Sequence, residues 1–168
     1  MWIIAGQEKG ETMQPILQAI TGKENQGDLS TSYQALVQFY CAFNSRDMHM
    51  MSQNWAQSDE IVMNNPLGGI KRGWSEVRPV YEQLFSGSTE VYVEYCDYTI
   101  HSTADVFYAV GWDRGYFRSG SERIQLSIRV SRIFRKINSR WRQVHYHGSI
   151  EDSLLLAQYQ AALLGEGA

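Results

Sequence analysis

The chain has 168 residues, of which 43% are hydrophobic and 20% are charged, and its formal net charge is -3. This length and composition fit one soluble domain. A weakly negative charge provides no general attraction to nucleic acid or to membrane surfaces. The apolar run near the N-terminus is too short for a signal sequence or a membrane span. We therefore expect a cytoplasmic protein that binds neither nucleic acid nor membranes.

The first half of the chain contains mainly helical patterns. Residues 1–29 form a polar extension with at most one short helix, which we do not assign to the core. Beyond it, apolar spacing and capping residues predict three helices, and a short strand stopped by Pro66 separates the second from the third. The helices are expected over residues 30–45, 46–56 and 74–85, and the strand over residues 59–66.

The second half changes to the period of strands. Segments rich in β-branched and aromatic residues alternate with short polar turns, which is typical of an antiparallel meander. Four strands are expected over residues 90–100, 105–117, 122–136 and 140–149. An apolar helix and tail, residues 150–168, complete the chain, and Gly165 ends the helix. Helices followed by a meander predict an α+β fold, with one domain over residues 30–149.

The strand "RIQLSIRVSRIF" carries a charge on its apolar face. Side chains alternate along a strand, and Arg132 shares the phase of Ile128, Val130 and Phe134. An unpaired buried charge costs several kcal/mol. Arg132 is therefore expected to form an internal salt bridge, to reach solvent along its stem, or to meet an anionic ligand.

The stretch "WRQVHYHGS" holds two of the chain's four histidines. By the same alternation, Val144 and Tyr146 face the core, whereas Gln143, His145 and His147 lie on the opposite face. The two histidines could chelate a metal only with a further ligand, and nothing in the sequence brings one close. A catalytic pair is a second alternative. We favour a polar sheet face that a second subunit covers, and we assign no metal site.

The order of helices, "NNP" strand, helix and meander over residues 30–149 resembles the nuclear-transport-factor-2-like superfamily, including its SnoaL-like branch. The resemblance is strongest in "SRIFRKINSRWRQVHYHGS", which is also similar to the association domain of calcium/calmodulin-dependent kinase II. It implies a cone-shaped curved antiparallel sheet wrapped around the N-terminal helices, a cystatin-like α+β barrel. It also implies a pocket at the wide end and a homodimer through the convex sheet face.

Individual residues carry the resemblance further. "VQFYCAFNSRD" is similar to the first helix of ketosteroid isomerases, and Tyr40 matches their oxyanion-binding tyrosine. Asn65 stands where those enzymes carry an aspartate base, so their mechanism lacks its proton acceptor here. Arg132 matches a cavity arginine of the kinase association domain, but Gly148 replaces another.

These residues lead to two functional hypotheses. The first is a cofactor-independent isomerase, cyclase or lyase that acts on a small, partly apolar carbonyl compound by acid-base chemistry. Tyr40 and Arg132 would polarise the oxygen, and Asp113 or Asp59 would be the base, although either phase of the Asp113 strand could be internal. The expected ligand-binding residues are Trp55, Asn65, Tyr81, Val144 and Tyr146.

The second hypothesis is a non-catalytic dimeric domain that binds a ligand or self-associates. Two features motivate this hypothesis: the missing aspartate at position 65 and the apolar C-terminal helix. A lone exposed helix would not carry so many leucines, so this helix should close the cone or lie on a partner.

Overall fold

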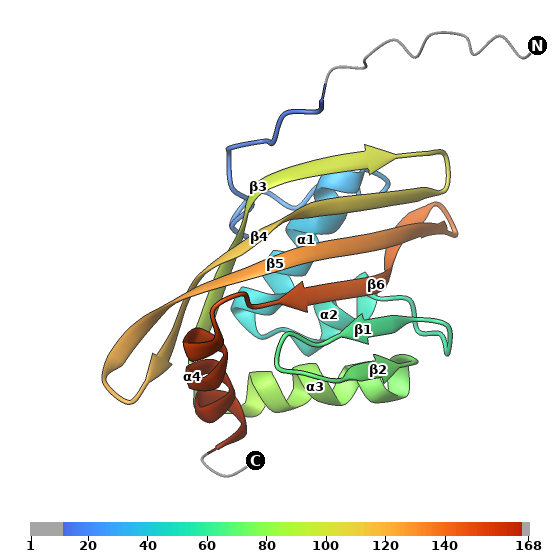
Figure 1. The fold of residues 1–168 in the computed structure, drawn as a ribbon. Helices are drawn as coiled ribbons and strands as arrows, with labels where there is room; N and C mark the ends of the chain where they lie inside the picture. Colours follow the sequence, from blue (N-terminus) through green and yellow to red (C-terminus); the bar gives the residue numbers. More distant parts are fainter. Residues whose placement is uncertain (1–11, 166–168) are drawn as a thin grey trace, which may run out of the picture.

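A computed structural model describes residues 12–165, which form an open, curved six-stranded sheet with helices packed against it (Figure 1). The α+β class and the curved sheet are confirmed, and the sheet does not close into a barrel. None of the described helices is long and apolar enough to cross a membrane. The elements are α1 (Ser32–Ser45), α2 (Met48–Asn54), β1 (Val62–Asn64), β2 (Ile70–Arg72), α3 (Trp74–Ser86), β3 (Val91–Ser102), β4 (Val106–Ser119), β5 (Glu122–Ile137), β6 (Arg140–Ser149) and α4 (Ser153–Leu164).

The sheet has the strand order β2-β1-β6-β5-β4-β3. Strands β3 to β6 form the predicted meander, and β1 joins it in parallel beside β6. Strand β2 was not predicted, because its segment was interpreted as a turn. The turn lies just before it, where Gly68 and Gly69 adopt positive φ angles of 113° and 80°, a region that favours glycine. This turn returns the chain antiparallel to β1 and widens the sheet by one strand.

Helix starts follow the expected capping chemistry. The Thr31 side chain accepts from the backbone N–H of Gln34 at the start of α1, and Asp47 accepts from that of Met50 at the start of α2. Such side-chain acceptors satisfy N–H groups that have no partner within the helix. Helix α1 then buries one side against the sheet, which places Tyr40 in the core.

The segment before α1 covers the outer edge of β3. Backbone bridges join Ile16 to Tyr98 and Ile20 to Tyr95, and Ile20 is fully buried in the core. The polar surroundings of Ile20 did not indicate this burial. Farther along the same edge, the Asn44 side chain donates to the carbonyl of Val93 and accepts from its N–H. The edge groups of β3 are thus partly satisfied within the chain.

A β-bulge changes the phase of β6. Ile133 pairs with His145 but Phe134 pairs with Gln143, so Val144 is an extra residue in β6. Gln143 is consequently fully buried on the inner face, and Val144 is only half-buried. The strict alternation predicted the opposite for both residues and was wrong there. Tyr146, beyond the bulge, faces inward as expected.

Candidate functional site

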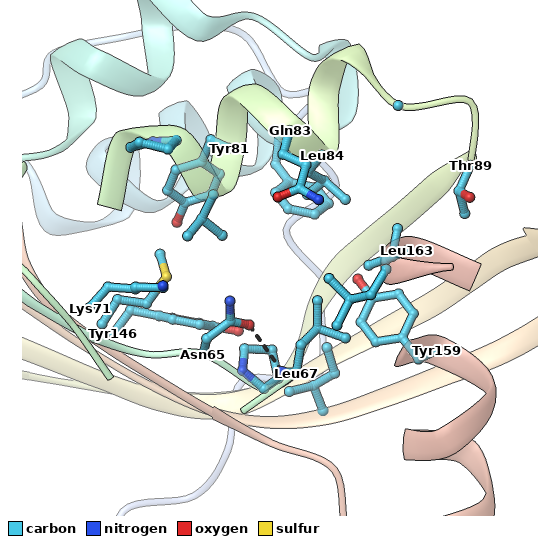
Figure 2. Close-up of a pocket in the computed structure, with 18 of the residues that line it drawn as sticks. Asn65, Leu67, Lys71, Tyr81, Gln83, Leu84, Thr89, Tyr146, Tyr159 and Leu163 are labelled. Carbon is cyan, nitrogen blue, oxygen red and sulfur yellow. Dashed lines mark hydrogen bonds between the residues drawn. The ribbon is translucent and has the colours of Figure 1, made fainter. Parts of the chain in front are cut away.

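A pocket of about 660 Å³ lies between the inner face of the sheet, helix α3 and helix α4 (Figure 2). Cavities of this size hold small organic molecules. The sheet contributes Asp113, Arg132 and Tyr146, and the segment around β1 and β2 contributes Asn65 and Lys71. Further apolar side chains complete the lining, among them Phe39, Phe43, Met63, Leu67, Val80, Leu84, Ile128 and Leu163.

Helix α4 closes one side of this pocket. Its N-cap, Asp152, accepts from the backbone N–H groups of Leu154 and Leu155, and Tyr159 packs on Phe117 with ring centroids 5.0 Å apart. Thr89 Oγ1 donates to the carbonyl oxygen of Ala162 at 2.7 Å. Of the two places expected for this helix, the structure therefore shows it over the pocket.

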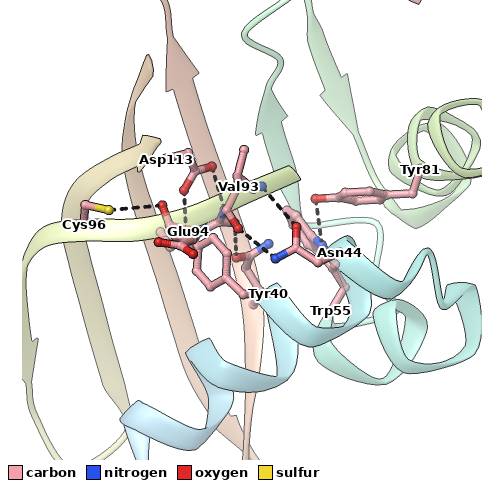
Figure 3. Close-up of polar contacts among 10 residues, drawn as sticks. Tyr40, Asn44, Trp55, Tyr81, Val93, Glu94, Cys96 and Asp113 are labelled. Carbon is pink, nitrogen blue, oxygen red and sulfur yellow. Dashed lines mark hydrogen bonds and ion pairs between the residues drawn. The ribbon is translucent and has the colours of Figure 1, made fainter. Parts of the chain in front are cut away.

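Arg132 stands at the base of the pocket inside a hydrogen-bonded network. Its Nη2 donates to Asp113 Oδ2 at 3.3 Å, its Nε to Tyr40 Oη at 3.3 Å and its Nη1 to Gln143 Oε1 at 3.0 Å. Tyr40 Oη donates to Asp113 Oδ1 at 2.5 Å (Figure 3). The internal salt bridge, one of the three alternatives expected for Arg132, is thus present. Asp113 lies on the inner face of β4. The sequence alone did not decide which phase of this strand faces inward.

Aromatic rings enclose the guanidinium. The Arg132 Cζ atom lies 3.6 Å from the ring centroid of Phe39 and 4.6 Å from that of Tyr146. The side chain has no solvent exposure, so its charge is stabilised by the Asp113 carboxylate and by the ring faces. This environment fixes the orientation of Arg132 toward Asp113.

Burial raises the pKa of Asp113, while the Arg132 charge and the Tyr40 hydrogen bond act in the opposite direction. Burial also raises the pKa of Tyr40 well above its usual value, so this hydroxyl remains a proton donor. The arrangement holds a carboxyl group at the wall of a mostly apolar cavity with its pKa raised by burial. Such a group can accept or donate a proton.

The structure brings five of the predicted site residues to the pocket wall, namely Asn65, Tyr81, Asp113, Arg132 and Tyr146. Trp55 lies behind this wall, where its Nε1 donates to Tyr81 Oη at 3.3 Å (Figure 3). The Tyr40 hydroxyl likewise points to Asp113 and does not line the cavity. Val144 and the exposed Asp59 are not among the lining residues.

One pocket residue, Lys71, and one residue of the Arg132 network, Gln143, were missed. Lys71 belongs to the unpredicted strand β2, so no phase had been assigned to it. Gln143 was placed on the wrong face because the bulge at Val144 was not foreseen. The only sequence signal for Lys71 was its position after the Gly68–Gly69 turn, which could have been interpreted as a hairpin.

His145 and His147 lie on the outer face of β6, beside β1. Burial and the neighbouring His147 lower the pKa of His145, whereas its hydrogen bond to the backbone of Val62 raises this pKa by a smaller amount. Among residues 12–165, no cluster of three or more His, Cys, Asp or Glu side chains could hold a metal ion. The interface role expected for His145 and His147 would require a second subunit, so it stays a prediction.

A family model described as the SnoaL-like domain matches residues 33–153, from α1 to the start of α4. The chain belongs to this family. The matched range agrees with the resemblance stated for residues 30–149, and it covers the sheet and helices α1 to α3 but almost none of α4.

Solved structures share the fold of this SnoaL-like domain. A proposed dehydratase of the NTF2-like family from Streptomyces avermitilis is 19% identical, with a TM-score of 0.64 over 75% of this chain and 97% of that one. The association domain of C. elegans CaMKII is 18% identical, with a TM-score of 0.58 and coverages of 70% and 92%. A Nostoc punctiforme protein with a cystatin-like fold is 14% identical, with a TM-score of 0.57 and coverages of 72% and 89%. A search among curated proteins finds no match to this chain.

Proposed function

We propose that this SnoaL-like domain binds a small, partly apolar molecule in the pocket under α4 and converts it by cofactor-independent acid-base chemistry. Asp113 carries the proposal, since it is a buried carboxyl at the wall of a cavity large enough for such a molecule. An isomerase, cyclase or lyase reaction needs a group that takes a proton from carbon or returns one to it. Asp113 would perform this transfer.

The roles of Tyr40 and Arg132 follow from their contacts. Both groups donate to Asp113, so they would orient this carboxyl and set its pKa rather than polarise a substrate oxygen directly. Tyr81 lines the cavity itself, and its Oη accepts from Trp55, so its own hydroxyl proton would be donated to that oxygen. Asp113 thus keeps the base role expected from the sequence, whereas the oxygen-polarising role moves from Tyr40 and Arg132 to a tyrosine expected only as a ligand-binding residue.

The proposal is tested first as binding, with N-phenyl-1-naphthylamine, an uncharged probe whose fluorescence rises in apolar cavities. Ala162 lines the pocket, whereas its neighbour Ala161 is exposed on the same helix. We expect Ala162→Trp to fill the cavity and abolish probe binding, and Ala161→Trp to leave it unchanged. Equal binding by both variants, or none by the unmodified protein, would contradict the pocket as a ligand site.

A second candidate function, self-association, is favoured by the outer face of the sheet. Tyr108 and Val110 are each 45% exposed there. Across β5, they lie in the cross-strand rows of His145 and His147. Half-exposed apolar side chains beside imidazoles suit a homodimer contact, and the similarity to an association domain is in keeping with it.

A further inference from the structure

One cation of the pocket is not used by the Asp113 network. Lys71 lies opposite Met63 in the β1–β2 ladder, Met63 lies opposite Tyr146, and Tyr146 lies opposite Arg132. These residues therefore form one row across the inner face of the sheet. Lys71 ends this row on the edge strand, and its side chain is half-buried in the pocket wall.

The two cations in this row differ in their partners. Arg132 is neutralised by Asp113 and also bonded to Gln143. Among the ion pairs formed within residues 12–165, none includes Lys71. Glu76 also lines the pocket, but one of its carboxylate oxygens accepts the backbone N–H of Arg72 at 2.8 Å. Lys71 is thus the cation available to a bound molecule.

Other hydrogen-bond donors surround Lys71. Asn65 Oδ1 accepts from the Leu67 N–H at 3.0 Å, which leaves the amide NH₂ group as its free end. Tyr81 Oη accepts from Trp55, so its own proton can be donated to a ligand. In Figure 2 the Lys71 amine, the Asn65 amide and Tyr146 lie together at one end of the cavity, with the Tyr81 hydroxyl pointing toward it.

The opposite end of the cavity is largely apolar. Leu163 and the ring of Tyr159 reach this end from α4, Leu84 reaches it from α3, and Leu67 lies below them (Figure 2). A molecule that satisfies both ends needs an acidic head group and an apolar body. Hydrogen bonds from a cation to an anion are roughly twice as strong as neutral ones, so the head group should determine the orientation of the molecule.

We propose that the ligand of this pocket is an amphipathic organic acid whose anionic group binds Lys71, Asn65 and Tyr146, with its apolar body under α4. This inference rests on the proposed function and specifies its substrate class. It also places the atoms next to the acidic group over the middle of the inner-face row, toward Asp113.

The test compares two probes with the same aromatic skeleton. 1-Anilinonaphthalene-8-sulfonate carries an acidic group, and N-phenyl-1-naphthylamine lacks it. We expect Lys71→Met to weaken binding of the sulfonate probe by about tenfold, as the loss of one charged contact would, and to leave the neutral probe unaffected. Lys71→Arg should retain the sulfonate affinity. Lys136→Met, which removes an exposed lysine outside the pocket, is the matched control.

The outcomes separate the inference from the proposed function. Unchanged sulfonate binding by Lys71→Met, with the neutral probe still bound and still excluded by Ala162→Trp, would overturn the acid class and leave the pocket proposal standing. Failure of both probes to bind the unmodified protein would overturn both. Retained binding of the neutral probe shows that the Lys71→Met pocket is folded, so a selective loss of sulfonate binding supports the inference.

Discussion

At the scale of single residues, two neighbouring tyrosines of the core differ in their hydrogen bonds. Tyr40 and Tyr95 are both fully buried, and their rings stack with centroids 5.4 Å apart. Tyr40 donates to Asp113, whereas the Tyr95 hydroxyl has no hydrogen-bond partner among the described residues. We predict that Tyr40→Phe lowers the free energy of unfolding by about 2 kcal/mol, because it leaves a buried carboxylate oxygen without its donor. Tyr95→Phe should cause no loss.

The same pair gives a pH dependence of known sign. The pKa of Asp113 is raised above 3.8 in the folded state, so its contribution to stability is complete below this value and is lost as the pH rises through the folded pKa. Tyr40→Phe removes a hydrogen bond that lowers the pKa of Asp113. The loss of unfolding free energy caused by this substitution should therefore grow from acidic to neutral pH. Chemical denaturation across this range, with a carboxyl NMR titration of Asp113, measures both quantities. An equal, pH-independent loss in Tyr95→Phe would contradict the prediction.

Residue patterns in the sequence predicted part of the site. Arg132 was recognised because a charge on an apolar strand phase needs a partner, and alternation is a strong signal in a long regular strand. Its partner Asp113 could not be fixed, since both phases of β4 carry aromatic residues. Gln143 and Lys71 were missed for a different reason. Their placement depends on a one-residue bulge and on a three-residue strand, and neither changes the local composition enough to be detected.

At the scale of elements, α4 depends on a few anchors. Tyr159 is buried against Phe117, whereas Leu154 on the same helix is 67% exposed. We predict that Tyr159→Ala lowers the free energy for local opening of α4 by about 3 kcal/mol, the usual cost of removing a buried aromatic side chain. Hydrogen exchange of the amides of Ser153–Leu164 should accelerate accordingly.

Leu154→Ala is the matched control for this helix and should leave the exchange rates of α4 unchanged. The amides of β5 should be protected equally in both variants, because β5 lies inside the sheet between β4 and β6. If Tyr159→Ala accelerated exchange equally in β5 and α4, the helix would unfold only together with the sheet. That result would exclude α4 as a separately opening cover of the pocket.

At the scale of the whole molecule, the order of elements was the most predictable feature. Apart from one short strand before the third helix, helical patterns fill the first half of the chain and strand patterns follow until the C-terminal helix, and this order indicates helices packed against a meander. The pattern could not show which surface would carry the proposed dimer contact. The outer face carries arginines as well as Tyr108 and Val110, and only the strand registers place these apolar side chains in the rows of His145 and His147.

The proposed homodimer can be tested at this face. We predict that Val110→Lys shifts the protein from dimer toward monomer, because a buried ammonium without a partner costs several kcal/mol at an interface. Leu17→Lys is the control, since Leu17 is 79% exposed and belongs to the segment along the β3 edge. Sedimentation velocity over a range of concentrations measures the equilibrium. A monomeric unmodified protein, or a dimer equally resistant to both substitutions, would remove the outer face from consideration, whereas a selective loss would assign the contact to the face that carries His145 and His147.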